Sequence, residues 1–156
     1  MTSIIKSGKP ALLALAALLG TAACQTSTSG DSTVPPALQL AGTDWVLIEY
    51  GTGAGDSGMN EVPPYDYTLT LASGGDAVFK LDCNRGRGSW EASPEGNGGT
   101  LSFGPIASTR AMCPPGSIGQ QLANDMAAVT AYSIYDGRLT MTLGSSGKTY
   151  VWDRVD

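Results

Sequence analysis

The fold is decided by residues 65–81, whose sequence is YDYTLTLASGGDAVFKL. Aromatic and apolar residues at positions 65, 67, 69 and 71 alternate with polar ones, which is the period of a β-strand with one buried face. The SGGD segment at residues 73–76 is a turn signal, and residues 77–81 resume with strand-forming side chains. This stretch therefore predicts an antiparallel β-hairpin.

Short segments of the same kind continue on both sides of this hairpin. A strand is expected to begin at Trp45, and the Gly- and Pro-rich residues 51–64 are expected to form an irregular loop. Further strands are expected at residues 86–90, 100–103, 106–109, 131–135, 138–143 and 149–152. Asp136-Gly137 is a two-residue hairpin turn signal. The pattern predicts a mainly β fold, a small antiparallel β-barrel-like domain of about eight short strands.

One segment departs from the strand pattern. Apolar residues at positions 118, 122, 126 and 129 share one face of a helix, and Ser117 with Gln120 matches a capping box. Pro114-Pro115 cannot continue a strand ladder, so the chain is expected to leave the sheet at Cys113. The sequence therefore predicts one α-helix of about three turns, whose apolar stripe closes one open end or face of the sheet.

The first 23 residues have the pattern of an export signal. Lys6 and Lys9 precede an apolar run at residues 11–19, and small residues then lead into Cys24. The run is far shorter than the roughly 20 residues of a membrane-spanning helix. The cysteine after small residues resembles a bacterial lipoprotein processing box, so we predict a lipoprotein signal peptide at 1–23 and acylation of Cys24. Thr21 stands where that box usually has Leu, which leaves plain cleavage and secretion as the alternative.

Residues 24–41 are predicted to be a flexible tether, because Thr, Ser, Gly and Pro dominate them and bury little apolar surface. The folded domain is then expected at residues 42–156. The anchor at Cys24 makes the membrane its first expected partner. Gln25 is not the Asp that holds many enterobacterial lipoproteins in the inner membrane, which favours the outer membrane, facing the periplasm.

Composition excludes several functions. Loss of Lys6 and Lys9 with the signal leaves 7 basic against 14 acidic residues, a net charge of −7, which argues against nucleic acid as a partner. The chain has no histidine, which excludes Ser-His-Asp and Cys-His catalysis. The acidic residues are scattered and do not match a calcium-binding loop. We therefore predict no catalytic residue, cofactor or metal, and we expect a monomer.

An exported compartment allows Cys83 and Cys113 to form a disulfide. Closing a loop of about 30 residues is expected to stabilise the fold by about 3 to 4 kcal/mol.

A series of short motifs surrounds these cysteines. They are Cys83-Asn84-Arg85, Gly88 with Trp90, Leu101-Ser102-Phe103 and Thr109-Arg110-Ala111-Met112-Cys113, followed by the helix and Tyr132. In order and spacing the series resembles the META/HslJ-like domain family (DUF306) of bacterial envelope proteins, over residues 42–153. The resemblance implies a small β-barrel-like domain with one helix, links to envelope maintenance or stress response, and no established catalytic residues.

This resemblance implies a set of motif residues: Asn84, Arg85, Gly88, Trp90, Thr109, Arg110 and Met112. The chain departs from the family pattern at three places. Asp82 stands where Gly is usual, Ala111-Met112 reverses the commoner order, and Gln120 or Gln121 stands where an acidic residue is frequent.

Several side chains have two interpretations without the family. Asn84 is expected to bond its own main chain at a strand end, where Asn tolerates left-handed backbone. The arginines at positions 85, 87 and 110, together with Asp82, either grip a carboxylate or phosphate or pair with nearby acids on a solvated surface. The second interpretation is favoured.

The aromatic residues also have two interpretations. The tryptophans at positions 45, 90 and 152 are expected to fill the barrel. Alternatively, the tyrosines at positions 65, 67, 132 and 135 leave a gap that admits a small apolar or sugar-like ligand.

The sequence therefore predicts a non-enzymatic envelope lipoprotein, a META/HslJ-like module for envelope maintenance or stress response with an envelope protein as partner. The alternatives are an inhibitor of a basic hydrolase such as lysozyme, for which the acidic charge provides steering, and a small-ligand binder with a barrel cavity. An enzyme is the least favoured, because no nucleophile stands beside a base.

Overall fold

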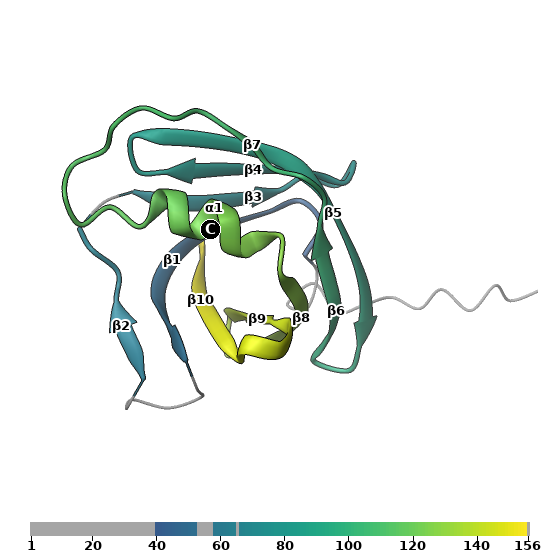
Figure 1. Cartoon of the computed structure of the whole chain (residues 1–156). Helices are drawn as coiled ribbons and strands as arrows, with labels where there is room; N and C mark the ends of the chain where they lie inside the picture. The colour runs from purple at the N-terminus through teal and green to yellow at the C-terminus, as the bar shows by residue number, and fades with distance from the viewer. Residues whose placement is uncertain (1–39, 53–57, 65, 156) are drawn as a thin grey trace, which may run out of the picture. The chain divides into compact units, whose positions relative to one another are not determined.

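The computed structural model describes residues 40–52, 58–64 and 66–155 (Figure 1). The predicted signal peptide, the lipidation site Cys24 and nearly all of the predicted tether lie outside these residues, as does Tyr65. Within the described part of the chain, no helix is both long and apolar enough to cross a bilayer.

Eight antiparallel strands form a closed barrel, which confirms the predicted mainly β fold. In order around the barrel they are β1 (Thr43–Thr52), β3 (Tyr67–Leu71), β4 (Asp76–Leu81), β5 (Asn84–Glu95), β6 (Gly98–Phe103), β8 (Val129–Tyr135), β9 (Arg138–Leu143) and β10 (Lys148–Val155). Strand β10 pairs with β1 over most of its length, and this pairing closes the sheet. This closure leaves neither β1 nor β10 as the free edge of an open sheet.

Two short strands lie outside this circuit. Strand β2 (Met59–Glu61) pairs with β1, and β7 (Ala107–Ser108) pairs with β5. The expectation of an irregular loop over residues 51–64 is therefore wrong for Gly51 and Thr52, which belong to β1, and for residues 59–61, which form β2. Gly51 permits the β2 pairing, because a Cβ at this position would collide with the carbonyl oxygen of Gly58.

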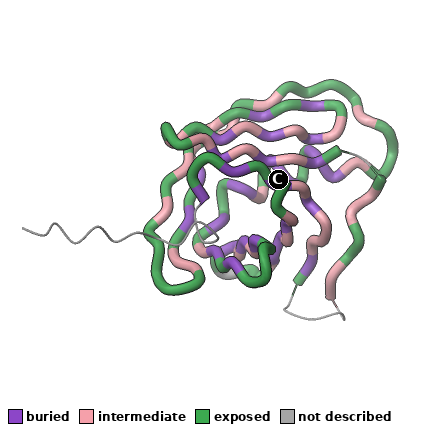
Figure 2. The backbone as a smooth tube through the Cα atoms, turned by 180° about the vertical axis from the view of Figure 1, so that it is seen from behind, coloured by how far each residue is buried: buried purple, intermediate pink, exposed green. Residues whose placement is uncertain are grey.

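The predicted hairpin of residues 65–81 is present, with β3 paired to β4 across a tight turn. Buried and more exposed residues alternate along the strands (Figure 2), so that each strand turns one row of side chains inward. Trp45 and Trp152 are fully buried, and the Phe79 ring meets the Phe103 ring edge-on with centroids 5.5 Å apart. Leu40 is also buried in this core, so the barrel includes residues directly before β1.

The helix α1 (Gly119–Met126) lies across the opening of the barrel in Figure 1. Its buried Leu122 and Met126 join the barrel core, which agrees with the predicted closing role. The helix is shorter than expected, because Val129 already belongs to β8. The predicted capping box is wrong, because Ile118 is the N-cap and its N–H donates to the hydroxyl oxygen of Tyr67 at 2.9 Å.

The chain reaches this helix through residues 109–118, which have no helix or strand. It therefore leaves the sheet after Ser108, at the end of β7, and not at Cys113 as expected. Gly119 lets the helix start directly against β4, because a Cβ there would collide with the carbonyl oxygen of Leu81. A 3-10 turn, η2 (Gly144–Ser146), joins β9 to β10.

Candidate functional site

Asn84 is the centre of a hydrogen-bond network at the start of β5. Its Oδ1 accepts hydrogen bonds from the Thr109 hydroxyl at 2.8 Å and from the Ala111 N–H at 2.7 Å. Its Nδ2 donates to the Ala111 carbonyl oxygen at 3.1 Å and to Cys113 Sγ at 3.0 Å. The residue is only 6% exposed. One amide therefore holds the segment that leads to the helix.

The structure corrects the expected role of Asn84. It bonds a segment about 25 residues away in the chain, and not its own main chain. The left-handed residue is Asp82, with φ of 62°, two positions earlier. A positive φ favours glycine but is accessible to Asp, which explains why a position where the family usually has Gly accepts this residue.

The predicted disulfide is present and joins Cys83 to Cys113, with the two Cα atoms 5.5 Å apart. It lies directly beside the Asn84 network. We call these five residues, Cys83, Asn84, Thr109, Ala111 and Cys113, the Asn84 clamp. Both the covalent bond and the amide fasten the same segment to the start of β5.

Asp82 lies next to the clamp, and its Oδ2 is buried without a hydrogen-bond partner. This carboxylate and the sulfurs of Cys83 and Cys113 lie within 4.8 Å of one another. Metal binding by cysteine requires a thiolate, and both sulfurs are held in the disulfide. The oxidised protein therefore offers no sulfur ligand at this position.

The three arginines near the clamp, at positions 85, 87 and 110, lie on the surface. Arg85 and Arg87 are exposed on the outer side of β5, and Arg110 is exposed close to Asn84. The salt bridges in the described residues are Lys80–Asp66, Arg138–Asp153 and Lys148–Asp125. Among the described residues, none of these three arginines forms the salt bridge with a nearby acid that the favoured interpretation expected.

The remaining motif residues have separate roles. Gly88 leaves room for Ile106 and for the carbonyl oxygen of Pro105, which a Cβ would approach at 3.2 Å. Met112 is 99% exposed, so its side chain does not contribute to the core. Trp90 is half-buried: it packs against the core but also lines a surface groove.

A second polar cluster, which the sequence analysis missed, joins the last turn of α1 to β10. Asp125 Oδ2 accepts hydrogen bonds from the Tyr150 hydroxyl at 2.6 Å and from Lys148 Nζ at 2.5 Å. Lys148 Nζ also lies 5.3 Å from the centroid of the Tyr150 ring, and the Tyr50 ring stacks on that ring with centroids 6.1 Å apart. We call Asp125, Lys148 and Tyr150 the Asp125 cluster. Nothing in the spacing of these residues along the chain indicates that they meet.

The pKa values of Tyr150 and Lys148 are both raised. Burial raises the pKa of Tyr150 to about 12, and the hydrogen bond to Asp125 acts in the same direction. Partial burial lowers the pKa of Lys148, but the hydrogen bonds to Asp125 and Tyr150 outweigh it, and the pKa is raised. At neutral pH Tyr150 is therefore neutral and Lys148 is charged, so neither acts as a general base.

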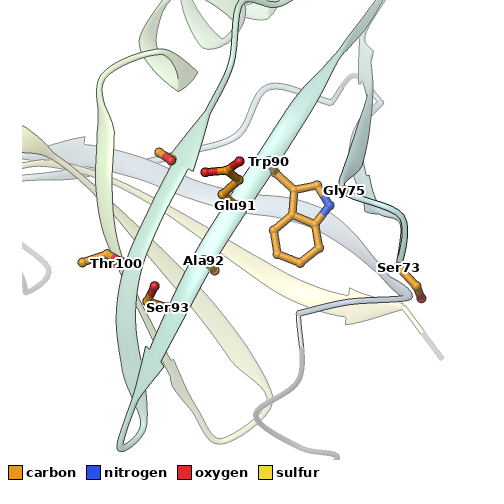
Figure 3. A pocket seen from close by; sticks show the side chains of 8 residues that line it. Ser73, Gly75, Trp90, Glu91, Ala92, Ser93 and Thr100 are labelled. Carbon is orange, nitrogen blue, oxygen red and sulfur yellow. The ribbon is translucent and has the colours of Figure 1, made fainter.

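The groove beside Trp90 lies on the outside of β5 and β6 and has a volume of about 490 Å³ (Figure 3). We call it the Trp90 groove. It is lined by Trp90, Glu91 and Ser93 of β5, by Thr100 and Ser102 of β6, and by the turn between β3 and β4. The volume lies within the roughly 300–1,000 Å³ that small-molecule sites occupy.

The alternative of a cavity between four tyrosines is wrong for the three that the structure describes. Tyr67 and Tyr132 are buried in the core, whereas Tyr135 is 80% exposed. Tyr135 stands on β8 one position after the inward-facing Ile134, so its side chain points away from the interior. These side chains do not surround a common space.

Comparison with known proteins assigns the family. A model of the META domain matches residues 38–155. The chain belongs to the META domain family. No curated protein matches the chain. Among solved structures the META domain is similar to a DUF4847 family protein from Bacteroides vulgatus, with a TM-score of 0.51, 11% sequence identity, and coverage of 73% of this chain and 93% of that chain. At this identity the likeness supports the fold alone.

Family membership does not favour inhibition of a basic hydrolase by this META domain.

Proposed function

We propose that the protein is an exported lipoprotein, anchored through Cys24, whose META domain acts without catalysis as a binding module in envelope maintenance or stress response. The observation that carries the proposal is the Cys83–Cys113 disulfide. Such bonds form and persist in exported compartments and are rare where glutathione keeps thiols reduced. The basic, apolar and small-residue sequence ahead of Cys24 supports the same location.

A binding role agrees with the chemistry of the side chains that the fold brings together. The Asn84 clamp consists of neutral groups and a disulfide, and all of its hydrogen bonds stay within the domain. In the Asp125 cluster both titratable partners of the carboxylate hold their protons at neutral pH. Neither site places a nucleophile beside a base.

The proposed location is the outer membrane, with the domain facing the periplasm. A single acyl chain binds a membrane only marginally, whereas two or more give stable anchoring, so the proposal requires multiple acylation of Cys24. Residues 24–41 would serve as the spacer between lipid and domain. We propose a monomer that meets an envelope protein as its partner.

Labelling of Cys24 tests the proposal. Radioactive palmitate should enter the protein in growing cells, and globomycin should cause an unprocessed precursor to accumulate. The Cys24→Ser variant should lose the label, its processing and its membrane association. The matched variant Thr21→Leu, which restores the usual residue of the processing box, should keep all three. Normal processing and membrane association of Cys24→Ser would contradict the proposal.

A further inference from the structure

The Trp90 groove has an aromatic wall that the fold holds rigid. The indole Nε1 of Trp90 donates to the Ala72 carbonyl oxygen at 3.1 Å, and its backbone N–H donates to the Gly75 carbonyl oxygen at 2.8 Å. In Figure 3 the indole lies between β5 and the turn that carries Ser73 and Gly75. Because the ring is already fixed, stacking of a ligand on it costs little side-chain entropy of Trp90.

Polar side chains form the other half of the groove. Glu91 on β5 lies opposite Ser102 on β6, and Ser93 lies opposite Thr100. Residues directly opposite in an antiparallel pair share one face, and all four of these are exposed. The groove therefore presents one carboxylate acceptor and three hydroxyl groups on the outer face of β5 and β6. Trp90 lies opposite Phe103 on the inward row, so its indole borders these groups at the edge of β5 that β4 leaves free.

The charge of the groove limits what can bind. Its lining includes Glu91 but neither Lys nor Arg, so an anion would meet repulsion without a compensating cation. A purely apolar ligand would cover the carboxylate and hydroxyl groups without replacing their hydrogen bonds to water. The lining favours a neutral ligand that carries both hydroxyl groups and an apolar face.

A pyranose ring has both properties. Its C–H face carries a small positive partial charge and packs on the negative face of an aromatic ring, while its equatorial hydroxyls donate to carboxylates and exchange hydrogen bonds with Ser and Thr. We propose that the Trp90 groove binds a neutral oligosaccharide, with one ring stacked on Trp90 and its hydroxyls bonded to Glu91 and to the hydroxyl groups of β6.

An extended peptide is the other occupant to consider. Strand β4 pairs with β5 only as far as Ser89, whereas β5 continues to Glu95 against β6, which leaves one edge of β5 without β4 beyond that point. Pro94 lies on this stretch and has no N–H to donate to an added strand. The lining and this proline both favour the saccharide.

Titration of the purified full-length protein with neutral oligosaccharides tests the proposal. The probes are β-1,4-linked N-acetylglucosamine trimers and α-1,4-linked glucose trimers, followed by NMR of the tryptophan indole N–H groups. The chain has three tryptophans, of which Trp45 and Trp152 are fully buried. At least one probe should shift the Trp90 indole signal saturably and leave the other two in place. The Trp90→Phe variant identifies that signal.

Substitution of exposed groove residues separates binding from stability. Glu91→Gln should weaken oligosaccharide binding about tenfold, since one charge-assisted hydrogen bond contributes about that factor. Glu95→Gln on the same strand lies outside the lining and should leave the affinity unchanged within about twofold.

Three outcomes would overturn the proposal. The first is the absence of any saturable shift with either trimer up to about 10 mM, a concentration at which even weak saccharide sites bind. The second is an equal loss of affinity in Glu91→Gln and Glu95→Gln. The third is a Trp90 shift produced by an extended peptide and by neither saccharide. The proposal does not depend on the lipid anchor, because none of these readouts involves Cys24.

Discussion

The Asn84 clamp and the Asp125 cluster fasten the two ends of the segment that contains α1, and they do so by different means. The clamp fastens the segment before α1 to β5 with a disulfide and a buried neutral amide. The Asp125 cluster fastens the last turn of α1 to β10 with a carboxylate, an ammonium group and a phenol, and its Lys–Asp pair is about one-quarter exposed. A buried amide or covalent bond retains its strength across pH, whereas a charged pair varies with ionisation and salt. The attachment of the segment before α1 should therefore be independent of pH and salt, whereas the attachment of the last turn of α1 should weaken as either changes.

Removal of the disulfide should have the largest effect. The double variant Cys83→Ala/Cys113→Ala should lose about 3 to 4 kcal/mol of unfolding free energy, because the bond closes a loop with a sequence separation of 30 residues. Urea unfolding followed by tryptophan fluorescence measures the loss. Cys24→Ser is the matched control and should unfold at the native urea concentration. A loss below about 1 kcal/mol would mean that the disulfide is not the main source of the clamp's contribution to stability.

Asn84→Ala should be the next most damaging change. It removes the hydrogen bonds that a nearly buried amide makes to the Ala111 N–H and carbonyl, at a cost of about 1 to 2 kcal/mol, because Ala111 itself is exposed and water can replace part of the lost bonding. Urea unfolding of the disulfide-intact protein checks this value. Asn97→Ala, at an exposed turn, should cost less than about 0.5 kcal/mol. Equal losses of unfolding free energy in the two variants would contradict the central role of Asn84 in the network.

The Asp125 cluster should respond to alkaline pH. The native state holds the Tyr150 proton with a pKa of about 12, against about 10 for an unfolded tyrosine. The stabilisation from this preference is complete below about pH 10 and is lost as the pH rises toward about 12. Lys148 and Tyr132, whose pKa values are also raised, act in the same direction.

Tyr150→Phe tests this response. The unfolding free energy of the variant should fall less steeply between about pH 10 and 12 than that of the native protein, with a residual slope from Lys148 and Tyr132. Tyr135→Phe, which alters a tyrosine that is 80% exposed, should keep the native slope. Identical slopes in all three proteins would show that the cluster does not couple the proton of Tyr150 to folding.

The smallest effect is expected at the salt bridge between Arg138 and Asp153. Its side chains are 57% and 42% exposed, and it joins β9 to β10. Arg138→Ala should change the unfolding free energy by less than about 0.5 kcal/mol, and added salt should remove even that difference. A loss as large as that of Asn84→Ala would break the distinction between buried and exposed fastenings.

Much of the barrel was predictable, because alternation of apolar and polar residues reports directly on strands with one buried face. The hairpin of β3 and β4 and the Asp136-Gly137 turn, where both residues have positive φ, followed from local signals. The strand boundaries did not. β2 and the long second half of β5 depend on pairing partners far away in the chain, and periodicity within a segment does not report on those.

The candidate sites divide in the same way. The disulfide was predictable, since few cysteines limit the pairings. The bonds of Asn84 to Thr109 and Ala111 were not, because they join segments about 25 residues apart through side-chain geometry. The Asp125 cluster brings together a helix end and a strand, and the Trp90 groove combines two strands with a turn. In each of these two sites, residues far apart in the sequence meet only because the strands close into a barrel.

The most direct test of the account is the intact mass of the protein extracted from membranes without reduction and treated with a thiol-alkylating reagent. The account predicts a chain of residues 24–156 that is heavier by its acyl groups, lacks the two thiol hydrogens of Cys83 and Cys113, and takes up no alkyl label. A chain with an unmodified Cys24 and two alkylated cysteines in the domain would contradict it.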